Sequence, residues 1–106
     1  MSSFVVEKNI AKAKTLTTAF YTDPKYFEEA KEQVTSALKI SNGQPIFLYY
    51  LSAILFALGK TKEATLQLEH AMAKSPKQVK QFVELNPSIL QNHHVVDVIS
   101  RFKRKR

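Results

Sequence analysis

The 106-residue chain contains no cysteine and only two glycines. Without cysteine it has no disulfides, no thiolate metal ligands and no thiol nucleophile, which fits a reducing compartment. Two isolated glycines do not form a glycine-rich phosphate loop or the glycine-flanked turn that carries a nucleophile in many hydrolases. Because the sequence patterns of these catalytic sites are missing, we expect a protein that is not an enzyme and that carries no cofactor.

Long apolar runs are missing as well. The longest, residues 46–58, is broken by Ser52 and falls short of the roughly 20 residues that span a bilayer. No basic region precedes the apolar residues 4–6, which argues against a secretory signal. Hydrophobic residues make up 44% and charged residues 24%, a balance that predicts a packed core. We therefore expect a single domain over residues 1–106, with no membrane span and a cytoplasmic location.

Acidic residues are fewer than basic ones, and the positive excess lies at the end of the chain. The net charge is +7, and five of the sixteen basic residues occupy the last six positions, while the remainder holds eleven lysines against nine acids. This basic tail gives the second hypothesis for function, binding of nucleic acid or an anionic surface. Solubility and a favourable interaction with the dipole of a last helix account for the tail equally well. The residues concerned are Arg101, Lys103, Arg104, Lys105 and Arg106.

Prolines and glycines divide the chain into six predicted helices. Each of the four prolines follows a residue that suits a helix cap, and proline is well tolerated at the first helical position. Gly43 and Gly59 follow apolar stretches, where a residue with a left-handed backbone closes a helix. No alternation of β-branched and polar residues predicts a strand, so we expect an all-α fold. The predicted helices span residues 3–22, 24–40, 45–58, 61–74, 76–85 and 87–102.

The sequence repeats itself with a period of 34 residues. The pair Glu29-Ala30 recurs as Glu63-Ala64. A fixed period in this range is typical of arrays that are built from one supersecondary unit. Other positions with the same separation keep their residue or their apolar character: Gln33 and Gln67, Val34 and Leu68, Ala37 and Ala71, Leu38 and Met72, and Ser41 and Ser75.

Residues 45–78 carry the fuller pattern, which consists of Leu51, Ser52, Gly59, Glu63, Ala64, Leu68, Ala71 and Pro76. In this pattern the chain resembles the tetratricopeptide repeat (TPR), a helix-turn-helix unit. Residues 11–44 resemble it less closely, because Asp23-Pro24-Lys25 replaces the glycine of the turn. Residues 79–102 are then expected to be C-terminal capping helices, which cover the last apolar face of a solenoid, and residues 101–106 form the basic tail. The resemblance implies a tandem helix-turn-helix α-solenoid with close helix crossings at Ala30, Ala64 and Ala71.

The resemblance also implies a non-catalytic scaffold that binds a protein or peptide in a concave groove. Relatives that clamp a chaperone's C-terminal carboxylate use lysine and asparagine side chains there, and Tyr49 and Ala53 do not provide them. An apolar groove that takes a peptide or a helix is therefore expected. Two alternatives stay open: the last helices cover this surface, or a second copy of the chain occupies it in a homodimer. The candidate partner-binding residues are Lys12, Thr15, Thr22, Ile46, Tyr49, Ala53 and Phe56.

The histidines do not form a pattern that predicts a metal site. His93 and His94 stand next to each other, with Asp97 one turn further along. Adjacent side chains on a helix point about 100 degrees apart, so the two imidazoles do not readily hold one ion, and no third ligand is spaced to help. We expect no bound metal.

Overall fold

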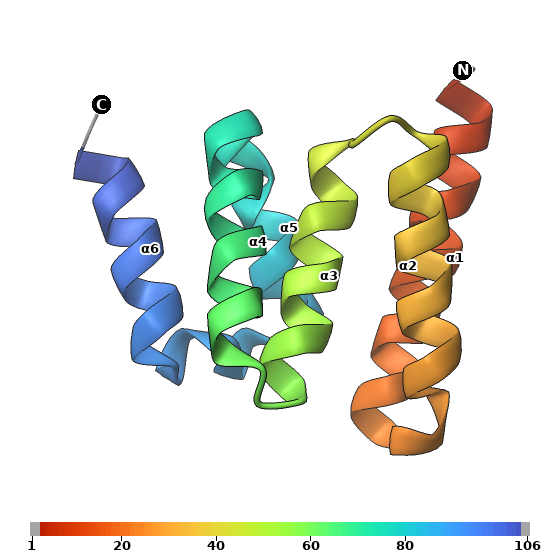
Figure 1. Ribbon diagram of the computed structural model, residues 1–106, viewed down its shortest axis with the longest axis horizontal. Helices are drawn as coiled ribbons and strands as arrows, with labels where there is room; N and C mark the ends of the chain where they lie inside the picture. The colour runs from red at the N-terminus through yellow and green to blue at the C-terminus, as the bar shows by residue number, and fades with distance from the viewer. Residues whose placement is uncertain (1–2, 105–106) are drawn as a thin grey trace.

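The structure is a computed structural model that describes the backbone of residues 3–104. The side chains of residues 3–7, 20–22, 24 and 104 lie outside the description. Within this range the chain is all-α, as predicted, and contains no strand (Figure 1). Its α-helices are α1 (Ser3–Thr22), α2 (Phe27–Ile40), α3 (Pro45–Ala57), α4 (Thr61–Lys74), α5 (Val79–Leu85) and α6 (His93–Arg104), and three short 3-10 segments are η1 (Pro24–Tyr26), η2 (Pro76–Gln78) and η3 (Pro87–Gln91).

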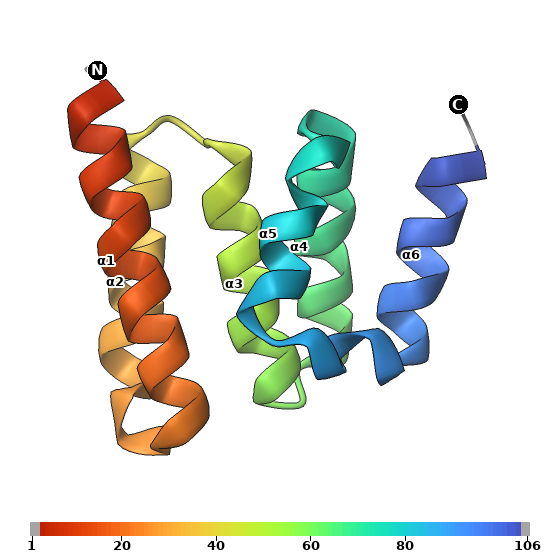
Figure 2. The ribbon, with the colours of Figure 1, turned by 180° about the vertical axis from the view of Figure 1, so that it is seen from behind.

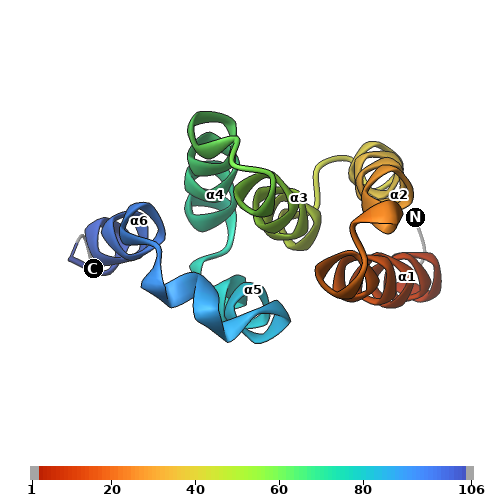
Figure 3. The same cartoon turned by 90° about the horizontal axis from the view of Figure 1, so that it is seen from below.

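The helices form an array with the two ends of the chain at opposite sides (Figure 1). The α1–α2 hairpin lies at one side, the α3–α4 hairpin in the middle and α6 beside α4 at the other side. Seen from below (Figure 3), α3 is the central helix, and it contacts α1, α2, α4 and α5. Helices α2 and α4 begin and end 34 residues apart, which is the period of the sequence.

Proline starts four of the helical segments, but only Pro45 starts an α-helix directly. Pro24, Pro76 and Pro87 each start a 3-10 segment instead. The prediction of one continuous helix over residues 87–102 is therefore wrong: the chain forms η3, passes through Asn92 and then starts α6. The side chain of Asn92 supports this new start, because its Oδ1 accepts the backbone N–H of His94 at 2.9 Å. The residues before Pro45, Pro76 and Pro87 make no side-chain cap bond, contrary to expectation.

The two glycines close helices, as predicted. Gly43 has φ +84° and Gly59 has φ +79°, a conformation that costs other residues steric strain. The N–H of Gly43 donates to the carbonyl of Leu38 at 2.9 Å, and the N–H of Lys60 donates to the carbonyl of Leu55 at 2.9 Å. These bonds satisfy carbonyls at the ends of α2 and α3, so each chain reversal is fixed by the backbone itself.

Small residues lie at the helix crossings of the array. Ala30, Ala64 and Ala71 have no exposed surface, as the TPR-like pattern predicts. Ser52 of α3 is equally buried, and its hydroxyl donates to the carbonyl of Ala64 at 2.8 Å, which holds α3 and α4 close together. Thr18, the equivalent residue of α1, is instead exposed and bonds within its own helix. The first hairpin therefore lacks the hydroxyl contact that joins the second.

The buried side chains form two clusters that meet at α3. One cluster joins α1, α2 and α3, and the other joins α3, α4, α5 and α6. Leu38, Leu51 and Leu85 are partly buried and pack against both clusters, so the two parts form one continuous core. No helix within residues 3–104 is long and apolar enough to cross a membrane.

Candidate functional site

The α3 residues that were expected to line an open groove lie in the core. Ile46, Tyr49, Ala53 and Phe56 are 3%, 0%, 1% and 8% exposed. The ring of Tyr49 packs against Phe82 of α5, with 5.9 Å between the ring centroids. These four side chains are therefore not available to a partner in this structure. For Tyr49 the structure agrees with the alternative that the last helices cover the expected groove, because α5 packs against its ring.

Helix α5 explains why this surface is closed. Seen from behind (Figure 2), α5 lies across the face of α3, and it also contacts α1. The hydroxyl of Tyr49 donates to the carbonyl of Ser75 at 2.7 Å, which ties α3 to the segment that leads into α5. Burial raises the pKa of Tyr49, and burial followed by the charge of Glu84 raises the pKa of Tyr50. Both tyrosines stay uncharged near neutral pH and act as packing residues.

The α1 residues of the expected groove have separate environments. Lys12 and Thr15 are exposed, and the Thr15 hydroxyl donates to the carbonyl of Ala11 in its own helix at 2.9 Å. The side chain of Thr22 lies outside the described residues. The structure therefore does not bring these residues together with the α3 set, because the α3 side chains point into the core.

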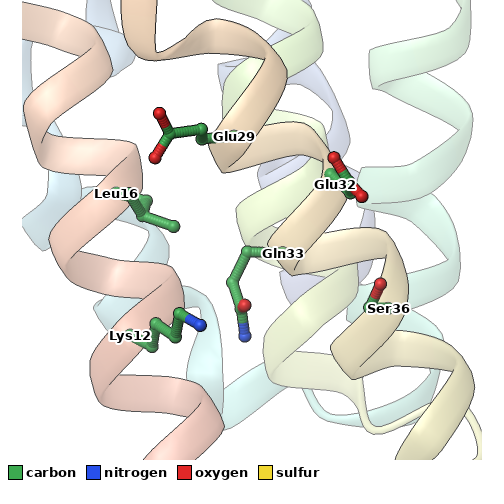
Figure 4. Close-up of a pocket in the computed structure, with 6 residues that line it drawn as sticks. All are labelled: Lys12, Leu16, Glu29, Glu32, Gln33 and Ser36. Atoms are coloured by element: carbon green, nitrogen blue, oxygen red, sulfur yellow. The ribbon is translucent and has the colours of Figure 1, made fainter.

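Lys12 lines a shallow hollow of about 260 Å3 between α1 and α2 (Figure 4). Lys12 and Gln33 extend into the space between the helices, whereas Glu32 and Ser36 lie on the far side of α2. The amide of Gln33 donates to Oδ1 of Asn9 at 3.3 Å, so part of the polar lining is already engaged. The hollow is open and its polar groups do not converge on one point. The other lining residues are Leu16 and Glu29.

A larger hollow of about 570 Å3, here named the α4–α6 groove, lies between α4 and α6. Leu66 is 50% exposed within it, beside the threonine side chains of α4. Arg101 of α6 forms ion pairs with Glu69 of α4 and Asp97 of α6, both at 3.3 Å, and the pair with Glu69 joins the two helices. The groove is lined by Thr61, Lys62, Thr65, Leu66, Glu69 and His94.

Helix α2 carries the corresponding surface one period earlier. That surface has a hollow of about 340 Å3, lined by Glu28, Lys31, Glu32, Thr35 and Ser36. Four of these residues precede Lys62, Thr65, Leu66 and Glu69 by 34 positions. A carboxylate at position 32 is thus replaced by a leucine at position 66, and a carboxylate at position 28 by a lysine at position 62. These differences are present in the sequence, but our prediction rested on the buried positions of the repeat and did not include Lys62 or Leu66.

Exposed large hydrophobic residues cluster in the C-terminal part of the array. Four such residues are exposed among the side chains that the structure describes: Ile40, Leu66, Leu90 and Val96. Only Ile40 belongs to the first hairpin. Val96 lies on the outer face of α6, in a hollow that Lys103 also lines. Most of the apolar surface that these four side chains leave open to a partner therefore lies on α4, η3 and α6.

The described residues of the basic tail and the histidines do not form a compact site. Arg101 is held by its two ion pairs, and Lys103 is exposed. The side chain of Arg104 and all of Lys105 and Arg106 lie outside the described residues. The rings of His93 and His94 lie 4.1 Å apart between centroids. Over the described residues, no three acidic, histidine or cysteine side chains are grouped so as to hold a metal ion.

The chain was compared with known proteins in three ways. No family model matches it. No curated protein matches it, and no solved structure matches it. The α4–α6 groove therefore has to be interpreted from its own residues.

Proposed function

We propose that the chain is a non-catalytic protein-interaction module that binds a protein partner through the α4–α6 groove. The observation that carries this proposal is Leu66, which is 50% exposed inside a hollow of about 570 Å3 that two different helices form. Helices that dock in a groove bury apolar side chains against apolar residues of its lining. The resemblance to the TPR supports the same class of function, although it implied a groove on the other side of the array.

The arrangement of the groove supports binding of a helix or an extended segment. Thr61 and Thr65 flank Leu66 on α4, and His94 faces them from α6. Burying the exposed half of a leucine contributes about 1 kcal/mol, so a partner needs further contacts along the groove. Lys62 and the Glu69–Arg101 ion pair offer polar contacts on either side of the leucine along α4. Val95 and Val98 of α6 are fully buried in the cluster that includes α4, so both walls of the groove are in place before a partner arrives, which lowers the entropic cost of binding.

Affinity capture with matched variants tests the proposal. The full chain, Leu66→Glu and Ile40→Glu are each used as bait in an extract, and an amine cross-linker records which lysines lie near a captured protein. Ile40 is 54% exposed on α2 and serves as the matched control, because the same change is made on the other hairpin. We expect a protein that the full chain and Ile40→Glu capture, that Leu66→Glu loses, and that cross-links to Lys62. Equal capture by all three baits would contradict the proposal.

The basic tail supports a second hypothesis, binding of nucleic acid or an anionic surface. Five cations lie within residues 101–106, and the chain as a whole is positive. The ion pairs of Arg101 with Glu69 and Asp97 remove one of these cations from that role. Self-association through an apolar face is a third hypothesis. Binding by the tail does not place Leu66 at the contact, so the capture experiment separates it from binding in the α4–α6 groove. Light scattering over a range of concentrations detects self-association.

A further inference from the structure

Charge is distributed unequally between the two halves of the chain. Residues 1–53 contain six basic and five acidic residues, whereas residues 54–106 contain ten basic and four acidic residues. Five of the ten basic residues of this half belong to the basic tail, and residues 54–100 hold five basic and four acidic residues. The tail begins beside the α4–α6 groove, since Arg101 pairs with Glu69 of the groove lining. A run of cations beside a binding site raises the local concentration of acidic partners and increases their rate of association.

The named charges beside the groove balance in number, but the acids are paired and a lysine is exposed. Glu69 and Asp97, the acids next to it, both pair with Arg101. Lys62 lines the groove and is exposed. An approaching segment therefore meets two carboxylates that are already neutralised in part, and an ammonium group that is open to solvent.

We infer that the segment bound in the α4–α6 groove is acidic and carries an aliphatic side chain. This inference rests on the proposed function and adds the chemistry of the partner. The aliphatic side chain contacts Leu66, and a carboxylate of the same segment pairs with Lys62. The two groups lie one turn apart on α4, so a partner helix meets both with residues that are themselves one turn apart.

The surface of α2 provides an internal comparison for this specificity. Glu28 and Glu32 are exposed at the positions that correspond to Lys62 and Leu66. An acidic segment is repelled there and gains no apolar contact. The chain thus presents two surfaces at equivalent positions of the repeat, and their side chains direct an acidic segment to α4 and away from α2.

Synthetic peptides of equal length test this inference with the full chain at physiological ionic strength. The first fluorescent peptide is a helix rich in glutamate with leucines along one face. In the second peptide serine replaces the leucines, and in the third lysine replaces the glutamates. We expect binding of the first peptide, and loss of binding for the other two. Raising the salt concentration weakens the first complex, because its ionic contacts are exposed.

Variants of the chain locate the binding of the first peptide. Leu66→Glu is expected to lower its affinity by about tenfold or more. Lys62→Glu should lower the affinity several-fold, and the reduction should be larger for peptides that are more acidic. Lys14→Glu makes the same change of charge at an exposed position of α1 and should leave the affinity unchanged. Circular dichroism and thermal unfolding of each variant show whether the fold is kept.

Several results would overturn the inference. The first is equal binding of the lysine-rich and glutamate-rich peptides, and the second is glutamate-peptide binding that Leu66→Glu does not change. A third is self-association through Leu66, detected by light scattering. The last is binding of an RNA oligonucleotide or of phosphatidylserine vesicles that depends on residues 103–106 and not on Leu66. A captured protein that needs Leu66 but whose binding segment, mapped by truncation, is basic leaves the proposed function intact and refutes the acidic partner.

Discussion

Helices α2 and α4 have the same buried face and different outer faces. Ala30 and Ala64, one period apart, are both fully buried, and so are Val34 with Leu68 and Ala37 with Ala71. On the outer faces, glutamates at positions 28 and 32 of α2 correspond to a lysine and a leucine of α4. Helix crossing constrains the buried positions through volume, whereas the outer positions are free to differ. The difference between the two outer faces is therefore where a specific function of this chain is to be sought.

The largest expected effect concerns the buried alanines. Ala64→Leu should destabilise the fold by about 3 kcal/mol, because a larger side chain separates α3 from α4 and breaks the bond from Ser52. Ala30→Leu should cost about 1 to 2 kcal/mol, because α1 and α2 lie at the end of the array and can move apart more easily. Urea unfolding followed by circular dichroism measures both values.

An exposed alanine of α4 provides the control for this pair. Ala73→Leu adds the same side chain on the outer surface and should change the free energy of unfolding by less than about 0.5 kcal/mol. An equal loss of stability for Ala64→Leu and Ala30→Leu would show that the two hairpins are packed alike. Helices α2 and α4 would then be alike in the strength of their crossings as well as in the burial of their alanines.

Alkaline pH should affect the second hairpin through its buried tyrosines. Tyr49 and Tyr50 of α3 stand where α1 has Thr15 and Leu16. Their pKa values are raised in the folded chain, chiefly by burial, so the folded state keeps protons that the unfolded state releases above its pKa of about 10. The contribution of these tyrosines to stability is therefore fully present below pH 10 and is lost as the pH rises further. At pH 11 a tyrosine that stays protonated in the folded state contributes a loss of about 1 kcal/mol.

Urea unfolding at several pH values between neutral and alkaline measures this loss. Tyr50→Phe should reduce the slope of stability against pH, since phenylalanine does not titrate. Tyr49→Phe should reduce the slope too, and it should also lower stability at neutral pH because it removes the bond to the carbonyl of Ser75. An unchanged slope in both variants would mean that other groups cause the alkaline loss.

The helices and their crossings could be predicted because the information is local or periodic. Pro45, Gly43 and Gly59 mark helix ends through backbone conformation alone. The 34-residue period placed Ala30 and Ala64 at equivalent positions, and both are buried. These features depend on neighbours in the sequence or on a repeated register, so the residue types were sufficient.

The state of the groove could not be predicted in the same way. Burial of Tyr49 depends on where α5 docks, and that helix of seven residues has no period that relates it to α3. Exposure of Leu66 depends on where α6 lies, and α6 begins only after the 3-10 segment at Pro87 and Asn92. We expected a continuous helix at that proline. Because this connection was predicted wrongly, the position of α6 and the α4–α6 groove beside it were not predicted.

The smallest expected effect compares two hydroxyl groups at equivalent positions. Ser52→Ala should destabilise the fold by about 1 kcal/mol, because the buried hydroxyl of Ser52 joins α3 to α4 through the carbonyl of Ala64. Thr18→Ala should be neutral or stabilise by a few tenths of a kcal/mol, since its exposed hydroxyl bonds only within α1 and alanine favours the helix. Equal losses in urea unfolding would show that Thr18 also joins two helices. Opposite signs would show that the second hairpin alone uses a side-chain hydroxyl to hold its crossing.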